Sequence, residues 1–188
     1  MADTQHRAEP KFAGDIPSAP SEPRARTLRV PAMRALAVLR VMFGLTFLWA
    51  FLDKTFGLTY ATSSSDAWID GGHPTFGYLQ IATGPFEDMY KNIAGDAWAD
   101  WLFMLGLLGI GVTLTLGIGM RVGAACGAAM YVLMWTVVLP PEQNPVLDEH
   151  LLGAVTMIVL ALTFAGETWG FGRMWSRMPL VRRFPILR

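Results

Sequence analysis

Residues 101–139 read WLFMLGLLGIGVTLTLGIGMRVGAACGAAMYVLMWTVVL and contain a single charged residue, Arg121. A helix needs about 20 mainly apolar residues to cross the hydrocarbon core of a bilayer. The apolar residues run on continuously, whereas the strands of a membrane barrel would alternate apolar and polar residues. Only the short segment Gly119–Val122 separates the two halves. The stretch therefore predicts two membrane-spanning helices joined by a tight turn.

Two more apolar stretches flank this pair. Ala35–Leu52 is interrupted by Arg40 alone, and Leu151–Ala165 reaches spanning length if its helix begins near Val146. Asn144 followed by Pro145 is a favourable helix start, because asparagine caps helix N-termini and proline suits the first turn. Charged residues make up 16% of the chain, against about 25% in soluble domains. We predict an all-α membrane protein: a four-helix transmembrane bundle with spans at about 35–55, 98–120, 122–139 and 146–168.

The remaining segments divide the chain into a core and two tails. Residues 1–30 are rich in proline and show no apolar periodicity, which is typical of disorder. We expect a disordered cytoplasmic tail at 1–30, the membrane domain at 31–178 and a basic cytoplasmic tail at 179–188. A signal peptide is not expected, because the first apolar run begins only near Ala35.

The basic residues predict the topology. Cytoplasmic flanks of membrane helices carry an excess of Lys and Arg. With both termini inside, 13 of the 15 basic residues lie on or near the inner side, and only Lys54 and Lys91 lie outside. We therefore expect both termini in the cytoplasm of a multi-pass protein of a bacterial plasma membrane.

The long outer loop, about Gly57 to Ala99, contains a helical pattern. Apolar residues recur there at i, i+3, i+4 and i+7, namely Phe86, Met89, Tyr90 and Ile93, with polar residues between them. This spacing predicts an amphipathic helix on the membrane surface or over the mouth of the bundle.

Small residues predict close helix packing. Glycines four apart, as at Gly119, Gly123 and Gly127, let helix backbones approach. Packing within the bundle is the favoured interpretation, and a homo-oligomer seam is the alternative. The lone cysteine, Cys126, suits packing as well, and a single cysteine excludes an intrachain disulfide and a C-x-x-C redox pair.

Ionisable residues at helix ends are the candidates for chemistry, because such groups are costly in a bilayer. At the outer ends of the spans lie Asp53, Lys54, Asp100, Asp148 and His150, with Trp101 beside them. One interpretation is helix capping and interfacial anchoring. The other is a single polar pocket in which His150 or a carboxylate exchanges a proton with a bound headgroup or substrate.

Two further ionisable residues lie on the inner side. Arg40 is expected at a depth similar to Glu167, and the simplest interpretation is that it reaches the inner surface or pairs with Glu167. A metal site is not expected, because the three histidines lie in different segments and Asp148 and His150, two residues apart, would point to different sides of a helix. The sequence contains no haem or flavin motif.

Several motifs in order carry a resemblance. An arginine in the first span precedes Gly44, Phe47 and Lys54; then come the run from Gly109 to Gly119 ending in Arg121, Asn144–Pro145 with Asp148 and His150, and the segment AGETWGFGR at 165–173. Over about residues 30–178 the chain resembles the DoxX family, in particular its actinobacterial branch close to DoxD, the large subunit of thiosulfate:quinone oxidoreductase. The resemblance implies a four-helix bacterial membrane protein with quinone as acceptor, and carries over Arg40, Lys54, Asp148, His150 and Glu167.

Three functions remain open at this point. The first is a subunit of a quinone-linked oxidoreductase, in which His150 and Asp148 manage protons and quinone contacts Asp53, Lys54, Asp100, Trp101, Arg40 and Glu167. The second is a non-catalytic subunit that anchors or organises a larger respiratory or redox complex. The third, a small-solute carrier, is weakened because no inverted repeat is evident. In the first two cases the expected partners are the lipid bilayer and a protein subunit. We do not expect the protein to bind nucleic acid.

Overall fold

The computed structural model describes residues 22–142 and 144–187, with side chains from Val30 onward. All regular structure in these ranges is helical, and they contain no strand. Three helices are long and apolar enough to cross a membrane: the Val30–Phe56 part of α1, α4 and α5. The predicted all-α class is therefore confirmed, and three of the predicted spans coincide with helices of membrane-crossing length and composition.

Helix α1 (Glu22–Phe56) is longer than its predicted span. It begins inside the expected tail, so residues 22–30 are helical, whereas residues 1–21 lie outside the described ranges. Helices α4 (Ala97–Leu116) and α5 (Met120–Val137) follow the predicted pair of spans. The turn between them has Gly117 at φ 71° and Gly119 at φ 58°, a left-handed conformation that glycine adopts without steric cost.

Helix α6 (Glu149–Leu162) has 14 residues, a length of about 21 Å. It is shorter than the roughly 17 to 25 residues of a typical span. It also starts later than predicted, because Asp148 caps it by accepting from the Leu151 N–H at 3.1 Å. The Asn144 side chain instead accepts from the amides of Val146 and Leu147 and closes a turn ahead of the helix.

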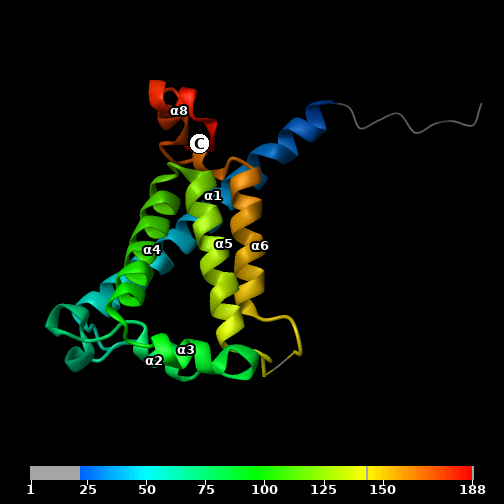
Figure 1. Cartoon of the computed structure of the whole chain (residues 1–188). Coiled ribbons are helices and arrows are strands. Elements are labelled where there is room, and N and C mark those ends of the chain that lie inside the picture. Colours follow the sequence, from blue (N-terminus) through cyan, green and yellow to red (C-terminus); the bar gives the residue numbers. More distant parts are fainter. Residues whose placement is uncertain (1–21, 143, 188) are drawn as a thin grey trace, which may run out of the picture.

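The helices pack in the order α1 on α4, α4 on α5 and α5 on α6 (Figure 1). They enclose one apolar core, whose buried members are Phe47, Met104, Leu107, Ile110, Leu114, Met120, Ala124, Met157, Leu160 and Ala165. Tyr131 connects α5 to α1, because its ring packs edge to face against Phe43 and Phe47. Burial of apolar area is thus shared by all four long helices.

One end of the bundle carries the long loop, built from η1 (Ser64–Asp66), η2 (Trp68–Asp70), α2 (Phe76–Gln80), η3 (Gly84–Phe86) and α3 (Glu87–Ile93). In Figure 1, α2 and α3 lie across this end. Tyr90 of α3 is buried with Val137 and its hydroxyl bonds Thr136 at 2.5 Å. Phe86 and Met89 of the same apolar stripe are exposed, so the stripe only partly faces the bundle.

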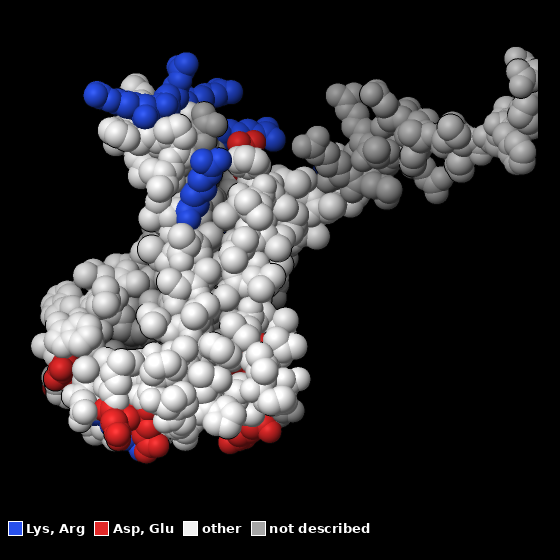
Figure 2. All heavy atoms as spheres, turned by 45° about the vertical axis from the view of Figure 1, so that its right-hand side comes forward, with Lys and Arg blue, Asp and Glu red and all other residues white. Residues whose placement is uncertain are grey.

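The opposite end carries η4 (Ala165–Glu167), α7 (Gly172–Trp175), α8 (Pro179–Arg183) and η5 (Pro185–Leu187). Residues 179–187, expected as a tail, fold back here through buried Val181 and a hydrogen bond from the Trp175 indole to the Leu187 carbonyl. Figure 2 shows Lys and Arg gathered at this end and most of the visible Asp and Glu at the other. We call the end with α7 and α8 the basic end, and the end with α2 and α3 the acidic end.

Candidate functional site

A hydrogen-bonded pair lies at the start of α6, at the acidic end. The Asp148 carboxylate accepts from Leu151 N with one oxygen and lies 2.6 Å from His150 Nδ1 with the other. The Asp148 and His150 side chains are only 8% and 12% exposed. The capping position creates the pair, because Asp148 has an extended backbone and its side chain turns toward the first helical turn.

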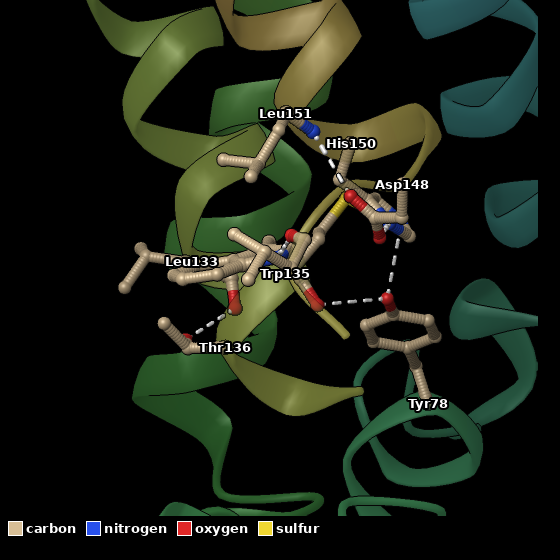
Figure 3. Close-up of polar contacts among 9 residues, drawn as sticks. Tyr78, Leu133, Trp135, Thr136, Asp148, His150 and Leu151 are labelled. Atoms are coloured by element: carbon tan, nitrogen blue, oxygen red, sulfur yellow. Dashed lines mark hydrogen bonds and ion pairs between the residues drawn. The ribbon is translucent and has the colours of Figure 1, made fainter. Parts of the chain in front are cut away.

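Tyr78 of α2 extends this pair into a chain. Its hydroxyl lies 3.2 Å from His150 Nε2 and 3.2 Å from the Met134 carbonyl oxygen (Figure 3). A phenol has one proton, so it donates either to Met134 or to His150. In the first arrangement the imidazole donates through both nitrogens and is charged; in the second it is neutral. We call Asp148, His150 and Tyr78 the relay.

The surroundings of the relay set the charge of its two acidic members, Tyr78 and Asp148. Burial, with the negative charges of Asp148 and Glu149 nearby, raises the pKa of Tyr78 to about 12. Burial alone would raise the pKa of Asp148, but hydrogen bonds from His150 and Leu151 and the charge of His150 outweigh it, and the pKa is lowered. At neutral pH Tyr78 is therefore protonated and Asp148 ionised. The stabilisation from Asp148 is present above its ordinary pKa and is lost as pH falls through the lower folded value.

A cleft of about 980 Å³ opens beside the relay. Its walls are mainly apolar, with Ile81 after α2, Val138 after α5, and Leu147 and Leu152 around the start of α6. The polar part of the lining comes from Thr83, Glu142, Asn144, Asp148, Glu149 and His150. Small-molecule sites are typically about 300–1,000 Å³, mostly apolar, with a few converging polar groups. The cleft has that character.

Tyr131 lies on the inner side of the relay, with its ring centroid 6.4 Å from that of His150. Gly153, one turn further along α6, leaves room for this ring: a Cβ there would lie 2.8 Å from the Tyr131 ring atoms. Since Tyr131 also contacts Phe43 and Phe47, it connects the relay to α1. Sequence analysis missed Tyr78 and Tyr131, because neither belongs to a motif.

Asp100 and Asp53 anchor the long loop at the acidic end. Asp100, 2% exposed, accepts from the Thr75 amide at 2.9 Å and its hydroxyl at 2.6 Å, and bonds His73 Nδ1 at 2.9 Å. Asp53 accepts from the amides of Tyr60 and Ala61. Each carboxylate thus holds one part of the long loop. Within the described ranges no hydrogen bond or ion pair joins either of them to the relay, so the five outer residues form separate groups.

Lys54 and Trp101 also lie in surroundings of their own. The Lys54 ammonium lies 5.9 Å from the Phe103 ring centroid, within the range of a cation–π contact. Trp101 is 57% exposed and meets Trp68 edge to face, with centroids 4.6 Å apart. Neither residue lines the cleft beside His150.

Arg40 is fully buried and neither reaches the surface nor pairs with Glu167, whose side chain is exposed. Its guanidinium donates instead to four backbone carbonyls: Leu114 and Thr115 at the end of α4, and Thr168 and Trp169 beyond η4. The last carbonyls of a helix have no intrahelical partner and carry partial negative charge. Arg40 therefore caps α4 and ties the 165–172 turn to it.

The glycines of the 165–172 segment permit this close approach. A Cβ at Gly166 would lie 2.5 Å from the Gly117 carbonyl oxygen, and one at Gly170 would lie 2.5 Å from the Gly166 carbonyl oxygen and 3.1 Å from Arg40 Nη2. Phe171 completes the cap by donating its amide to Leu116 O at 2.8 Å. The glycine-rich motif thus has a structural explanation at the basic end, away from the relay.

In the described part of the chain, one group of potential metal ligands lies together. The ligand atoms of Asp148, Glu149 and His150 all lie within 4.8 Å of one another. The expectation that Asp148 and His150 point to different sides is therefore wrong, because it assumed helical geometry at a residue that is extended. Asp148 and His150 are already bonded to each other, which favours proton chemistry for this pair.

No protein-family model matches the chain, and a search of curated proteins and of solved structures finds no similar protein.

Proposed function

We propose that the chain is the membrane subunit of a quinone-linked oxidoreductase, of the thiosulfate:quinone type or a related one. The observation that carries this proposal is the relay on the wall of a mainly apolar cleft, at one end of a bundle with three membrane-length helices. A lipid-soluble ring with polar oxygens suits such a wall, because apolar surface lies beside the imidazole of His150.

Quinone reduction consumes two electrons and two protons. The charged His150 gives its Nε2 proton to a quinone oxygen, after which Tyr78 turns its hydroxyl from the Met134 carbonyl to the vacated Nε2, while Asp148 keeps its bond to Nδ1–H. The second proton comes from water that enters the open cleft. The sequence has no haem, flavin or C-x-x-C motif, so the electrons come directly from the substrate or through a partner subunit.

The alternative is a non-catalytic anchoring or organising subunit. It is favoured by the use of the other buried charges: Arg40, Asp53 and Asp100 each bind backbone groups of this chain. If Asp148 only capped α6, all the buried charges among the described residues would be structural. The relay is the feature that separates the two functions.

Quinone content tests the proposal. Purification of the full chain in mild detergent, followed by extraction and chromatography, should give close to one quinone per protein. Widening the apolar wall with Leu152→Ala should lower that content several-fold, while Glu87→Gln on α3, outside the cleft, should leave it unchanged. A stable protein partner with no quinone would instead establish the organising role.

The proposed topology places both termini and the basic end in the cytoplasm. We expect cysteines introduced at Ser64 and Ser176, in a Cys126→Ala background, to react differently with a membrane-impermeant maleimide on intact cells: Ser64→Cys should label and Ser176→Cys should not. The physical reason is the retention of basic flanks on the cytoplasmic side. Labelling at position 176 but not at 64 would reverse the orientation.

A further inference from the structure

A second cleft lies at the basic end, remote from the relay. It has a volume of about 420 Å³ and is bounded by residues 30–34 of α1 on one side and by the end of α6 with η4 on the other. The α1 side contributes Val30, Met33 and Arg34, and α7 contributes Arg173. The remaining lining residues are Thr163, Phe164, Glu167 and Thr168.

Two exposed arginines flank this cleft, against the single carboxylate of Glu167 in its lining. The side chains of Arg34 and Arg173 are exposed, and neither forms an ion pair with any residue in the described part of the chain. They come from different elements, so the fold brings together two charges that repel each other. A guanidinium offers a planar fork of donors that matches two oxygens of a phosphate group.

The cleft is apolar as well as basic. Val30 and Phe164 line it with exposed side chains. Toward the middle of the bundle, α1 exposes Val38, Met42 and Leu45, and α6 exposes Val155, Ile158 and Leu162. A free inorganic anion would gain nothing from such walls, whereas a molecule with a phosphate head and hydrocarbon chains would bury both parts.

We propose that this cleft binds an anionic phospholipid. Its phosphodiester lies between Arg34 and Arg173, its acyl chains follow the exposed apolar faces of α1 and α6, and Glu167 accepts a hydrogen bond from a headgroup hydroxyl. A basic cleft between membrane helices at the predicted cytoplasmic side is a typical setting for an acidic lipid. The site is independent of quinone chemistry at the acidic end.

Native mass spectrometry of the full chain, with phosphatidylglycerol or phosphatidylcholine added to detergent micelles, tests the site. We expect one phosphatidylglycerol to be retained preferentially. Because each arginine contributes on the order of 1 kcal/mol to attraction of acidic lipid, Arg34→Gln with Arg173→Gln should weaken its binding about 10- to 30-fold. Arg182→Gln with Arg183→Gln removes the same charge from α8, outside the cleft, and should weaken it less than about 3-fold.

A second variant keeps the test independent of lost charge. Met33→Trp fills the cleft and retains both arginines, so it should displace the lipid while thermal unfolding in detergent stays close to that of the parent chain. Equal weakening by the two arginine pairs would overturn the proposal, since it would indicate general attraction to a basic surface. Equal retention of the two lipids, or displacement by inorganic phosphate at lipid-like concentration, would overturn it too.

Discussion

Replacing Arg40 with leucine should destabilise the folded bundle by about 3–5 kcal/mol. The change leaves four carbonyl acceptors, at Leu114, Thr115, Thr168 and Trp169, without their donor. Each buried polar group without a partner costs about 1–3 kcal/mol. Removing the guanidinium also relieves its own desolvation cost, but the Leu114 carbonyl stays buried and the other three stay partly buried without their donor. We therefore expect a net loss, measured as a lower midpoint of thermal or denaturant unfolding in detergent.

The matched control for Arg40→Leu is Arg177→Leu. Arg177 is an exposed arginine at the same basic end, so its loss should change the midpoint little. Arg40→Lys should fall between the two, because an ammonium keeps the charge but not the planar set of donors that reaches both the end of α4 and the 165–172 turn. Unchanged stability of Arg40→Leu would show that water or the neighbouring amides satisfy these carbonyls.

Replacing His150 with glutamine should lower quinone reduction by about 10²- to 10⁴-fold, the usual contribution of a positioned acid or base. Glutamine keeps hydrogen-bonding groups near Tyr78 but cannot carry a proton between Asp148 and the cleft. The assay follows reduction of a short-chain quinone by thiosulfate in membranes that contain the full chain. Parent membranes without turnover would contradict the proposed reaction with this donor, and a fully active His150→Gln would exclude His150 as the acid.

Asp148→Asn is the companion variant for the relay. Asparagine caps a helix as well as aspartate does, so α6 should remain capped through the Leu151 amide. It removes the negative charge that stabilises a protonated imidazole. We expect turnover to fall substantially with little change in the unfolding midpoint, and a Glu87→Gln control to behave like the parent. Loss of activity together with loss of folded protein would indicate a structural role instead.

The sequence by itself determined the positions of the long helices and the gathering of basic residues at one end of the bundle. Apolar runs of membrane length produce α1, α4 and α5, because a backbone in hydrocarbon must satisfy its own hydrogen bonds. A short turn between α4 and α5 is expected at Gly119–Val122; it lies slightly earlier, at 117–119, with Gly117 and Gly119 in the left-handed conformation. The pairing of Asp148 with His150 is partly predictable from the sequence too, since both are ionisable residues at the start of one helix, whereas the extended backbone at Asp148 is not.

Only the tertiary structure decided which charge meets which group. Arg40 binds carbonyls 74 to 129 positions away in the sequence, and Tyr78 reaches His150 from a loop 72 positions away. Periodicity reports which face of a helix is apolar, but not how one helix is turned against the next or where a loop is anchored. The roles of Asp53, Asp100 and the relay depend on those placements, because a hydrogen bond forms only within about 3 Å and at a narrow range of angles.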